Sequence, residues 1–540
     1  MANNFVEVKV EEGVLRGREE QSDGLKSVTF YSFEGIPFAK PPIGELRFKE
    51  PQPLEPWNGV KDALEGGPAC PQNMMGSVYG DEDCLYLNVF TPEHPDEISA
   101  LKPVFFSVHG GGFCGGDGRR EVWTPDYFID HDVVFVACNY RVGALGFLSL
   151  QNDEVSGNAG LKDVIQALRW TQWNIKQFGG DPDHVTVMGM SAGGAAVEFL
   201  LLSEMSRGLF KHAICQSGSS LNPWACNRNP KQLAVQLAET LGYVGNTADD
   251  KALVDFLRDR PAFDIVDKQL DLISLQERML VCAFTFAPCI EKKGKGEKFI
   301  TCSPQDILQG GHFIKVPVII GCTTNEGSVM FTPILDLELI NKNAEFIIPP
   351  HVNVPKNKRE DVAREIMQFY FGDKPVTMEN IDPLVDLIAD VAFNTGIHQA
   401  TYLLADNSPH PVYSYRFSKK RENSFLEDLL RKSFPDLKLK GAAHGADAEF
   451  IFKFNVPNVV TFKEHTDDEK KYVQALTTII TTFGKTGNPN SDSFPGWKPT
   501  LTSDPQYLEL GDDIKMIPGH LYAERIQFWN NVYDKYARIF

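Results

Sequence analysis

The chain has 540 residues, 42% of them hydrophobic, and a formal net charge of −19 at pH 7. The apolar content is enough for a large buried core and excludes a disordered chain. The negative charge argues against nucleic acid or an anionic membrane as the main partner, and it is compatible with an enzyme that acts on neutral or cationic substrates.

No targeting or anchoring signal is visible in the sequence. The N-terminus lacks an apolar stretch with a small-residue cleavage site, no later segment offers roughly 18 uncharged apolar residues, and the C-terminus carries no lipidation motif. No asparagine lies in an Asn-x-Ser/Thr site, and the ten cysteines are scattered, without the spacing of a metal cluster. We therefore expect a cytoplasmic protein; a mature form whose signal has been removed would instead be secreted.

The first part of the chain predicts short strands and an irregular segment. Residues 5–10 and 28–33 read as strands, and prolines crowd the stretch 37–56. Cys70 and Cys84 then enclose a short glycine-containing loop. Their spacing suits a disulfide in an oxidising compartment, whereas in a reduced cytosol we expect free thiols.

From about residue 85, strands alternate with helices, which is typical of a large, mainly parallel twisted sheet with helices on both faces. We expect strands at residues 85–90, 104–108, 133–140, 185–188, 213–216, 316–322 and 412–417, and helices at 158–178, within 228–285 and 355–405, and at 522–536. The charged loop 291–298 is expected to be solvated. No linker divides the chain, so we expect residues 1–540 to form one α/β domain with long helical insertions.

The segment Gly189-Met190-Ser191-Ala192-Gly193 follows a β-branched run and precedes an apolar stretch rich in glycine and alanine. A strand, a sharp turn and a helix form the context that a G-x-S-x-G nucleophile elbow requires. Ser191 would then lie at the tip of the turn, beside the free N–H groups of the first helical turn. A chance match within a loop is the alternative, so the assignment depends on the rest of the chain.

A serine hydroxyl becomes a good nucleophile only when an oriented base removes its proton. Glu326 directly follows the strand expected at 316–322. His444 lies in a loop of small residues after the strand expected at 412–417. These two residues give the chain order serine, acid, base. A solvated Glu326 within a polar turn is the alternative.

Other histidines fit structural positions better. His465 lies in a charged run, which predicts an exposed side chain. His398 falls inside a helical period and is expected to have a structural partner there, and His410 before Pro411 predicts a turn. His444 is therefore the best candidate among the twelve histidines.

The segment His109-Gly110-Gly111-Gly112-Phe113 directly follows the strand expected at 104–108. Consecutive glycines allow backbone N–H groups to turn toward a ligand, as in the HGGG-type loops that stabilise an oxyanion. We expect Ala192, the residue after the nucleophile, to supply a further N–H. A phosphate-binding loop is the alternative, but this segment lacks the Lys-Ser/Thr ending of a P-loop.

Besides these elements, four longer runs resemble the type-B carboxylesterase/cholinesterase family, and the resemblance extends over essentially the whole chain. They are Phe33-Glu34-Gly35-Ile36-Pro37-Phe38-Ala39, Glu82-Asp83-Cys84-Leu85-Tyr86-Leu87-Asn88, Asn139-Tyr140-Arg141-Val142-Gly143-Ala144-Leu145-Gly146-Phe147 and Phe178-Gly179-Gly180-Asp181-Pro182. The resemblance implies an α/β-hydrolase fold. It also implies a set of site residues: a triad of Ser191, Glu326 and His444, and an oxyanion hole of Gly111, Gly112 and Ala192. Two buried ion pairs are implied as well, Arg47 with Glu82 and Arg141 with Asp163.

The chain departs from this family at two positions that bear on specificity. Cholinesterases carry a tryptophan in the loop closed by the first cysteine pair, where it holds the choline cation, and the loop from Cys70 to Cys84 contains none. Choline esters are therefore not expected as preferred substrates. Met190 stands where many relatives carry glutamate, so we expect weaker attraction for cationic substrates and altered turnover.

We predict a serine carboxylesterase that works through an acyl-enzyme, acts on small-molecule carboxylic esters without a metal or cofactor, and is covalently inhibited by organophosphates. The chain is similar to insect intracellular carboxylesterases, which implies the metabolism of xenobiotic, insecticide, odorant or hormone esters. A specialised juvenile-hormone, pheromone or lipid esterase, and a slow-turnover protein that sequesters esters or organophosphates, are the alternatives. The sequence determines neither the physiological ester nor the oligomeric state.

Overall fold

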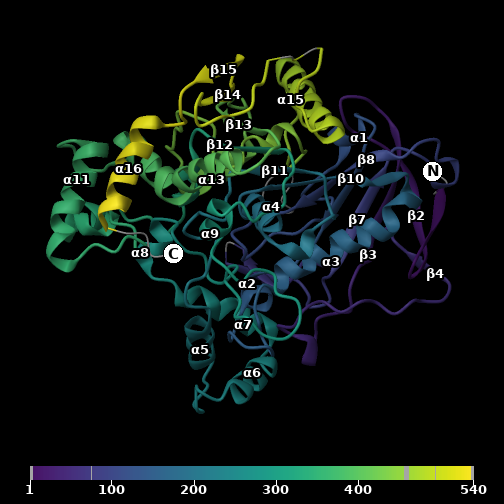
Figure 1. Ribbon diagram of the computed structural model, residues 1–540, viewed down its shortest axis with the longest axis horizontal. Coiled ribbons are helices and arrows are strands. Elements are labelled where there is room, and N and C mark those ends of the chain that lie inside the picture. Colours follow the sequence, from purple (N-terminus) through teal and green to yellow (C-terminus); the bar gives the residue numbers. More distant parts are fainter. Residues whose placement is uncertain (1–3, 75, 455–460, 493, 495, 537–540) are drawn as a thin grey trace.

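The structure is a computed structural model that describes residues 4–74, 76–454, 461–492, 494 and 496–536. Its centre is a 13-stranded sheet, within the described residues, in which strands from both ends of the chain take part (Figure 1). The sheet order is β1-β2-β3-β7-β9-β8-β10-β11-β12-β13-β14-β15, with β4 beside β2, and β5 and β6 form a separate hairpin. The strands are β1 (Phe5–Val10), β2 (Gly13–Gln21), β3 (Thr29–Pro37), β4 (Val60–Asp62), β5 (Gln72–Met74), β6 (Ser77–Tyr79), β7 (Tyr86–Thr91), β8 (Lys102–Val108), β9 (Val134–Cys138), β10 (Gly180–Met190), β11 (His212–Gln216), β12 (Val318–Thr323), β13 (Val412–Phe417), β14 (Gln506–Leu510) and β15 (Ile514–Pro518).

The middle of the sheet is parallel. Strands from β9 to β14 pair in parallel, whereas β1, β2, β3, β7 and β15 add antiparallel edges. Gly189 of β10 lies opposite both Val108 of β8 and Cys215 of β11. Because parallel strands end at the same edge of a sheet, the residues that follow β8, β10, β11 and β12 gather along one edge.

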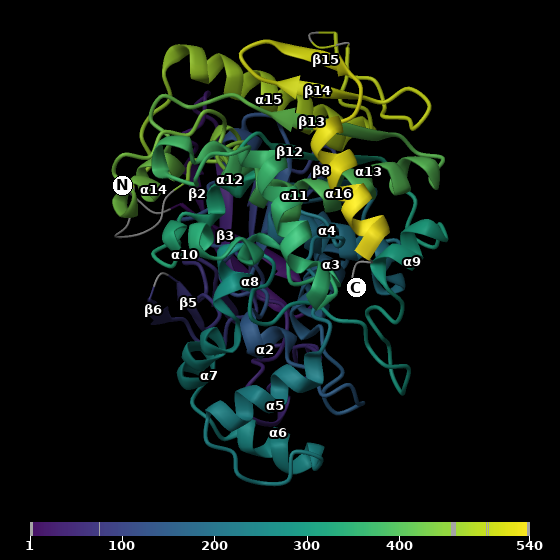
Figure 2. The ribbon, with the colours of Figure 1, turned by 90° about the vertical axis from the view of Figure 1, so that its left-hand side faces the viewer.

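Helices cover both faces and extend well beyond the sheet (Figures 1 and 2). The α-helices of the described residues are α1 (Asp126–Ile129), α2 (Gly143–Phe147), α3 (Ala159–Asn174), α4 (Ala192–Leu202), α5 (Pro230–Thr240), α6 (Asp250–Arg258), α7 (Ala262–Lys268), α8 (Leu275–Met279), α9 (Pro304–Gln309), α10 (Leu337–Lys342), α11 (Arg359–Phe371), α12 (Asp382–Ala389), α13 (Thr395–Asp406), α14 (Phe425–Ser433), α15 (Asp467–Thr486) and α16 (Ala523–Tyr536). A π-helical turn, Asp390–Asn394, joins α12 to α13. No helix in the described part of the chain has both the length and the apolar content needed to cross a membrane.

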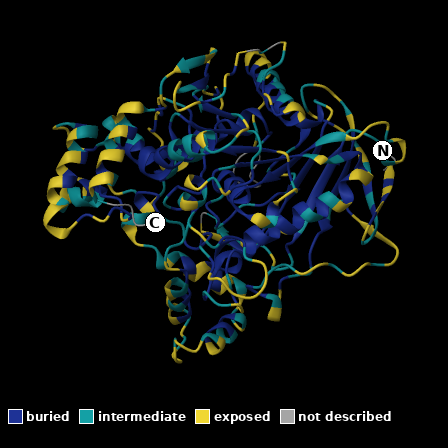
Figure 3. Cartoon of the chain, viewed as in Figure 1, coloured by how far each residue is buried: buried dark blue, intermediate teal, exposed yellow. Residues whose placement is uncertain are grey.

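The sheet divides the hydrophobic core in two, because alternate side chains of a strand face opposite sides. On β8, Val104 and Phe106 belong to the cluster that contains α3 and α4, whereas Phe105 belongs to the cluster that contains α1 and α15. Helix α15 packs so closely that a Cβ built at Gly484 would lie 2.2 Å from the Phe105 ring. Figure 3 shows the buried strands between the more exposed outer helices. Helices thus pack against the parallel strands on both faces of the sheet.

The expected α/β architecture is confirmed. The strand expected at 412–417 is β13, and the strand expected at 185–188 is the end of the longer β10. The helix expected at 158–178 is α3, which continues as the 3-10 helix Ile175–Phe178. The sequence pattern missed β2 and the hairpin of β14 and β15. Strand β15 is partly exposed along its length, so it lacks the apolar run that marks the buried strands.

Candidate active site

Ser191 lies in a strained turn at the centre of the parallel edge. It stands between β10 and α4 with φ 60° and ψ −124°, a region that a residue other than glycine rarely occupies. Its N–H donates to the Gln216 carbonyl oxygen over 2.7 Å, and its own carbonyl oxygen accepts from the Ala195 N–H over 3.0 Å. Ser191 is 9% exposed. A strained serine held between a strand and a helix is the geometry of a nucleophile elbow.

The elbow is possible because backbones approach one another closely at Gly193. A Cβ built at Gly193 would lie 2.1 Å from the Val108 carbonyl oxygen and 2.9 Å from that of His109. A Cβ at Gly110 would lie 3.2 Å from the Ser191 Cβ. The start of α4 and the loop after β8 are therefore in direct contact, and glycine is required where they meet.

The loop after β8 keeps side chains away from Ser191. Gly111 and Gly112 have φ of 106° and 64°, the left-handed region that favours glycine. A Cβ at Gly111 would lie 2.1 Å from the Gly115 carbonyl oxygen, and one at Gly112 would lie 2.9 Å from the Phe284 ring. Backbone groups are therefore what this loop offers a ligand. Ala192, the first residue of α4, adds an N–H from the end of a helix where these groups lack helical partners.

His109 supports this loop as a neutral side chain. Its Nδ1–H donates to the Gly110 carbonyl oxygen over 2.8 Å, and its ring stacks on Tyr140 with centroids 4.1 Å apart. The Tyr140 hydroxyl donates to the His109 carbonyl oxygen over 2.9 Å. Burial lowers the pKa of His109 to about 4, against the opposing effect of its hydrogen bond with Gly110. His109 is therefore uncharged at neutral pH.

Glu326 is fully buried at the end of β12 and is held from three directions. Its carboxylate accepts hydrogen bonds from the Ser217 hydroxyl and the Thr323 N–H, each over 2.6 Å. The third partner is His444 Nδ1, on the other carboxylate oxygen. Because an ionised carboxylate only accepts, the Nδ1 of His444 carries a proton and its Nε2 is left as the basic nitrogen. The alternative of a solvated Glu326 is wrong.

His444 lies where three separate segments meet. Its N–H donates to the Ser328 hydroxyl over 2.9 Å, and its ring lies 4.8 Å from that of Phe393. Asn325 and Ala443, the residues that precede Glu326 and His444, form a parallel bridge. The acid and the base are therefore joined by backbone pairing as well as by their side chains.

The loop of His444 also reaches the nucleophile elbow. A Cβ built at Gly445, directly after His444, would lie 2.8 Å from the Met190 sulfur, directly before Ser191. The three predicted triad residues thus come from neighbouring loops at one edge of the sheet. The uncharged thioether of Met190 lies against the backbone of the histidine loop.

The prediction for His465 was wrong. Its side chain is buried and not exposed, its ring stacks on Phe450 with centroids 5.6 Å apart, and burial lowers its pKa to about 4. It precedes Thr466, the residue that caps α15, so its charged neighbours continue into the solvent-facing first turn while its ring faces the core. His398 has the expected partner, since its Nε2 lies 3.3 Å from His520 Nδ1. His410 is exposed.

A second buried carboxylate near His444 was not predicted from the sequence. Asp447 accepts hydrogen bonds from the Tyr415 hydroxyl over 2.8 Å and from Gln216 Nε2 over 2.9 Å. Burial raises the pKa of Asp447, and the nearby Glu326 charge adds to that effect. Its position three residues after His444 was the only available signal. Ser217 was also missed, because its contact with Glu326 depends on the order of strands in the sheet.

Three aromatic rings form a wall along the site, which we call the aromatic wall: Phe393, Trp224 and Phe284. Phe393 contacts His444, and its ring lies 5.6 Å from that of Trp224. The Trp224 ring lies 5.7 Å from that of Phe284, which borders Gly112. The wall therefore extends from the base to the oxyanion loop.

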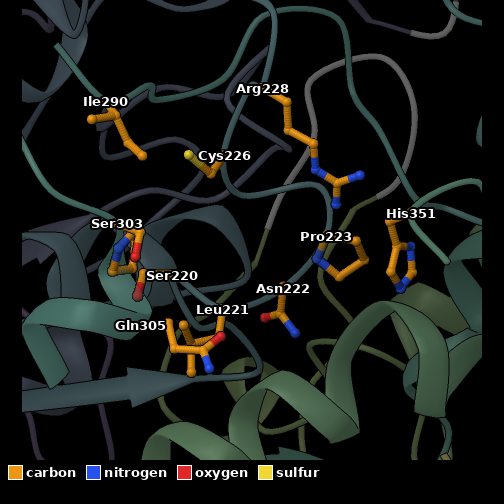
Figure 4. Close-up of a pocket in the computed structure, with 11 residues that line it drawn as sticks. Ser220, Leu221, Asn222, Pro223, Cys226, Arg228, Ile290, Ser303, Gln305 and His351 are labelled. Carbon is orange, nitrogen blue, oxygen red and sulfur yellow. The ribbon is translucent and has the colours of Figure 1, made fainter. Parts of the chain in front are cut away.

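One cavity borders this wall, and a second shares lining residues with the first. The first, of about 390 Å³, is lined by Trp224 and Phe284 together with residues of α5 and α8. A smaller cavity of about 40 Å³ is lined by residues of the loop after β11, including Leu221 and Asn222, and is shown in Figure 4. The lining of these two cavities does not include Ser191, Glu326 or His444. The wall therefore contacts His444 on one side and lines the larger cavity on the other.

The two ion pairs implied by the resemblance are present, and Cys70 and Cys84 are paired rather than free thiols. Cys70 and Cys84 form a disulfide with Cα atoms 5.0 Å apart. Arg47 donates to Glu82 through two nitrogens over 2.7 Å and 2.5 Å. Arg141 donates to Asp163 over 2.8 Å and 2.7 Å, and both side chains are buried. Breaking either pair leaves a charge without its partner.

Known proteins are similar in sequence and structure to this chain over nearly its whole length. The family described as "Carboxylesterase family" matches residues 4–529. Esterase FE4 of Myzus persicae is 36% identical, over 92% of this chain and 87% of its own. A juvenile hormone esterase of Tribolium castaneum is 32% identical, over 96% of this chain and 90% of its own. The crystal structure of juvenile hormone esterase from Manduca sexta, with OTFP covalently attached, superposes with a TM-score of 0.86 at 29% identity, covering 98% of this chain and all of that one.

Proposed function

The chain belongs to the carboxylesterase family and is a carboxylic ester hydrolase, and from this premise we propose that Ser191, His444 and Glu326 form its catalytic triad. The observation that carries the proposal is the contact of the buried Glu326 carboxylate with His444 Nδ1, at the sheet edge where Ser191 occupies a strained elbow. Nucleophile, base and orienting acid are the three parts that activation of a serine requires.

The mechanism follows from these positions. His444 Nε2 takes the Ser191 proton as the hydroxyl oxygen attacks the ester carbonyl, and the N–H groups of Gly111, Gly112 and Ala192 receive the developing oxyanion. His444 then gives this proton to the leaving alcohol, and an acyl-enzyme is left on Ser191. Water repeats the cycle, with His444 as base and then as acid, and releases the carboxylic acid. Glu326 orients the imidazole and stabilises its charged form in both halves.

The lining of the site favours neutral esters. The aromatic wall supplies apolar contact area beside His444, and Met190 adds an uncharged side chain where it borders the histidine loop. We propose xenobiotic, insecticide, odorant or hormone esters as the physiological substrate class. The names of the relatives support two options, a broad carboxylesterase and a specialised juvenile hormone esterase.

A Ser191→Ala variant tests the triad. Hydrolysis of p-nitrophenyl acetate is expected to fall on the order of 10⁵-fold with an unchanged melting temperature, because the nucleophile is lost and the fold is kept. Ser22→Ala, another serine with a buried side chain, is the control and is expected to retain full activity. Wild-type protein treated with an organophosphate should gain one adduct on Ser191 in intact-mass and peptide analysis. Full activity of Ser191→Ala would overturn the assignment.

A substrate panel separates the physiological options. Comparable kcat/KM for many short and aromatic esters supports a broad esterase, and a strong preference for juvenile hormone over all simple esters supports a specialised enzyme. A burst of product equal to the enzyme concentration, followed by negligible turnover, would support sequestration.

Domain organisation and compartment also belong to the proposal. We propose one catalytic domain for residues 1–540, supported by the presence of β1 and β15 in one sheet. The cytoplasmic location stays a prediction. Labelling of Cys70 and Cys84 after denaturation, in protein taken directly from its source, tests it, because both side chains are buried and a reducing compartment leaves them as free thiols.

A further inference from the structure

The π-helical turn Asp390–Asn394 fixes two rings of the aromatic wall. A π-helical turn changes the backbone hydrogen bonding of a helix, and such turns are often found at functional sites. Here the carbonyl oxygen of Ala392 accepts from Trp224 Nε1, and that of Phe393 accepts from Asn222 Nδ2, each over 2.8 Å. The turn therefore holds Trp224 by a hydrogen bond and carries Phe393 on its own backbone.

A buried ion pair anchors the turn to the C-terminal helix. Asp390 is fully buried and lies 3.1 Å from Arg525 Nε of α16. Its carboxylate also accepts from the Tyr370 hydroxyl over 2.6 Å and from Asn394 Nδ2 over 2.8 Å. Trp529 of α16 donates to the same Tyr370 hydroxyl over 2.7 Å. In Figure 2, α16 lies between α11 and α13.

Arg525 has further partners that fix its position. It also pairs with Asp386 of α12, and its guanidinium lies 4.2 Å from the centre of the Tyr522 ring. Burial raises the pKa of Asp390 to about 6 against the opposing effect of Arg525. The pair is therefore charged at neutral pH, and α16 is held to the turn by charge as well as by packing.

We propose that Asp390 and Arg525 are positioning residues that set the acyl-chain length the enzyme accepts, by holding the aromatic wall against the site. The inference rests on the proposed triad and extends it from chemistry to specificity. The chain of contacts runs from Arg525 through Asp390 to the π-helical turn, and from there to Phe393 and Trp224. The proposal places the wall on the side of the acyl chain, which stays on Ser191 in the acyl-enzyme, so that the rings beside His444 and Gly112 limit its length.

The direction of the effect follows from the space beside the wall. Trp224 and Phe284 line the cavity of about 390 Å³, so a wall that moves can admit a longer chain into that space. Removing one member of a buried ion pair leaves the other charge without its partner, and the segment that carries it must rearrange. Asp390 cannot rearrange without moving Phe393, three residues further along the same turn. Loss of the pair should therefore relax the selection against long acyl chains.

The experiment compares p-nitrophenyl acetate, butyrate and octanoate in wild-type protein and in Arg525→Met and Asp390→Asn. We expect the ratio of kcat/KM for octanoate to that for acetate to rise about tenfold or more in both variants. A series of acetate esters with different alcohols should change less than threefold, because the wall acts on the acyl chain. Tyr370→Phe removes one hydrogen bond to Asp390 and should raise the octanoate-to-acetate ratio by a smaller factor. This variant tests the inference if the two charge variants fold poorly.

Arg47→Met is the matched control, since it breaks another ion pair whose arginine hydrogen-bonds to Glu82 and to the carbonyl oxygens of residues 257, 258 and 260, none of which belongs to the wall. It should lower the melting temperature and leave the acyl-length ratio within twofold of wild type. An unchanged ratio in folded Arg525→Met and Asp390→Asn would overturn the inference, as would an equal change in Arg47→Met. Organophosphate titration of active sites is done on every variant. If the triad assignment is wrong, Ser191 will stay unlabelled. If only the positioning role is wrong, the variants will be labelled and will keep the wild-type ratio of octanoate to acetate hydrolysis.

Discussion

The nucleophile half and the acid–base half of the site are built in different ways. Ser191 and the oxyanion loop come from the adjacent strands β8 and β10, and they fit together because side chains are missing where backbones meet. Glu326 and His444 are 118 residues apart; the Ser217 hydroxyl donates to Glu326, and the Ser328 hydroxyl accepts from the His444 N–H. The first half is constrained by sterics and the second by polar contacts.

This difference predicts two kinds of response to mutation. An added methyl group in the nucleophile half meets closely packed backbone atoms. Hydrolysis should therefore either persist unchanged or be lost completely. A removed polar group in the acid–base half leaves the fold intact and lowers activity according to what that group does for His444. Four predictions, from the largest effect to the smallest, test this contrast.

Gly193→Ala should abolish hydrolysis and lower the melting temperature strongly. Its Cβ would lie 2.1 Å from the Val108 carbonyl oxygen, so α4 and β8 would have to separate and the oxyanion loop would move away from Ser191. Esterase assays and thermal unfolding measure both effects. Gly496→Ala, where a Cβ meets nothing within 4 Å, is the control. A stable and active Gly193→Ala would show that the elbow tolerates the separation.

Glu326→Gln should lower kcat about 10⁴-fold with little loss of stability. The amide is isosteric with the carboxylate, but it neither fixes the tautomer of His444 nor stabilises the imidazolium. Steady-state kinetics with p-nitrophenyl acetate gives the effect, and circular dichroism with thermal unfolding verifies the fold. Activity within tenfold of wild type would mean that Glu326 does not orient the base.

His109, in the nucleophile half, should be one of the groups that make the fold sensitive to acid. The pKa of His109 is about 4 in the folded protein and near 6.5 in an unfolded chain, so the unfolded chain binds more protons between these values. Stability contributed by the neutral ring is complete above pH 6.5 and falls as the pH drops, by ~3 kcal/mol near pH 4. The free energy of unfolding, measured with urea at several pH values, should therefore decrease less steeply toward acid pH in His109→Gln than in wild type. His410→Gln, at an exposed position, should keep the wild-type slope.

Met190→Glu should shift the pH dependence of catalysis by a modest amount. A carboxylate beside the loop of His444 favours the protonated imidazole, so the acid limb of kcat/KM should move up by roughly half to one pH unit. Cationic esters should gain several-fold over neutral ones. Met190→Gln has the same length without the charge and should change neither. Unchanged kinetics of Met190→Glu with both neutral and cationic esters would rule out an electrostatic role for this position.

The nucleophile half of the site was easier to predict from the sequence than the acid–base half. The elbow and the glycine loop are local, because a strand, a turn and a helix start occupy consecutive residues and leave a readable pattern. Glu326 and His444 could be selected only from their place after predicted strands. Asp447 and Ser217 left no such pattern, since their contacts arise from neighbouring strands that are far apart in the chain.

Two errors have one physical cause. His465 was expected to be exposed because of its charged neighbours, and Glu291 was placed in a solvated loop for the same reason. Glu291 is instead buried, where it accepts from Asn158 over 2.8 Å and pairs with Lys162 over 3.2 Å. Local charge density predicts exposure only on average, and a single polar side chain can turn inward when a partner from another element is there to meet it.

The sequence by itself determined the fold class, the order of the three residues proposed as the triad, and the positions where glycine is required, because each depends on strand and helix periodicity or on residues within one turn. Only the tertiary structure decided which aromatic rings line the site, what holds Glu326 and Asp447, and how α16 is joined to the π-helical turn. Those contacts bring together side chains from distant segments. Their geometry is set by the packing of the whole sheet and its helices, which no local pattern contains.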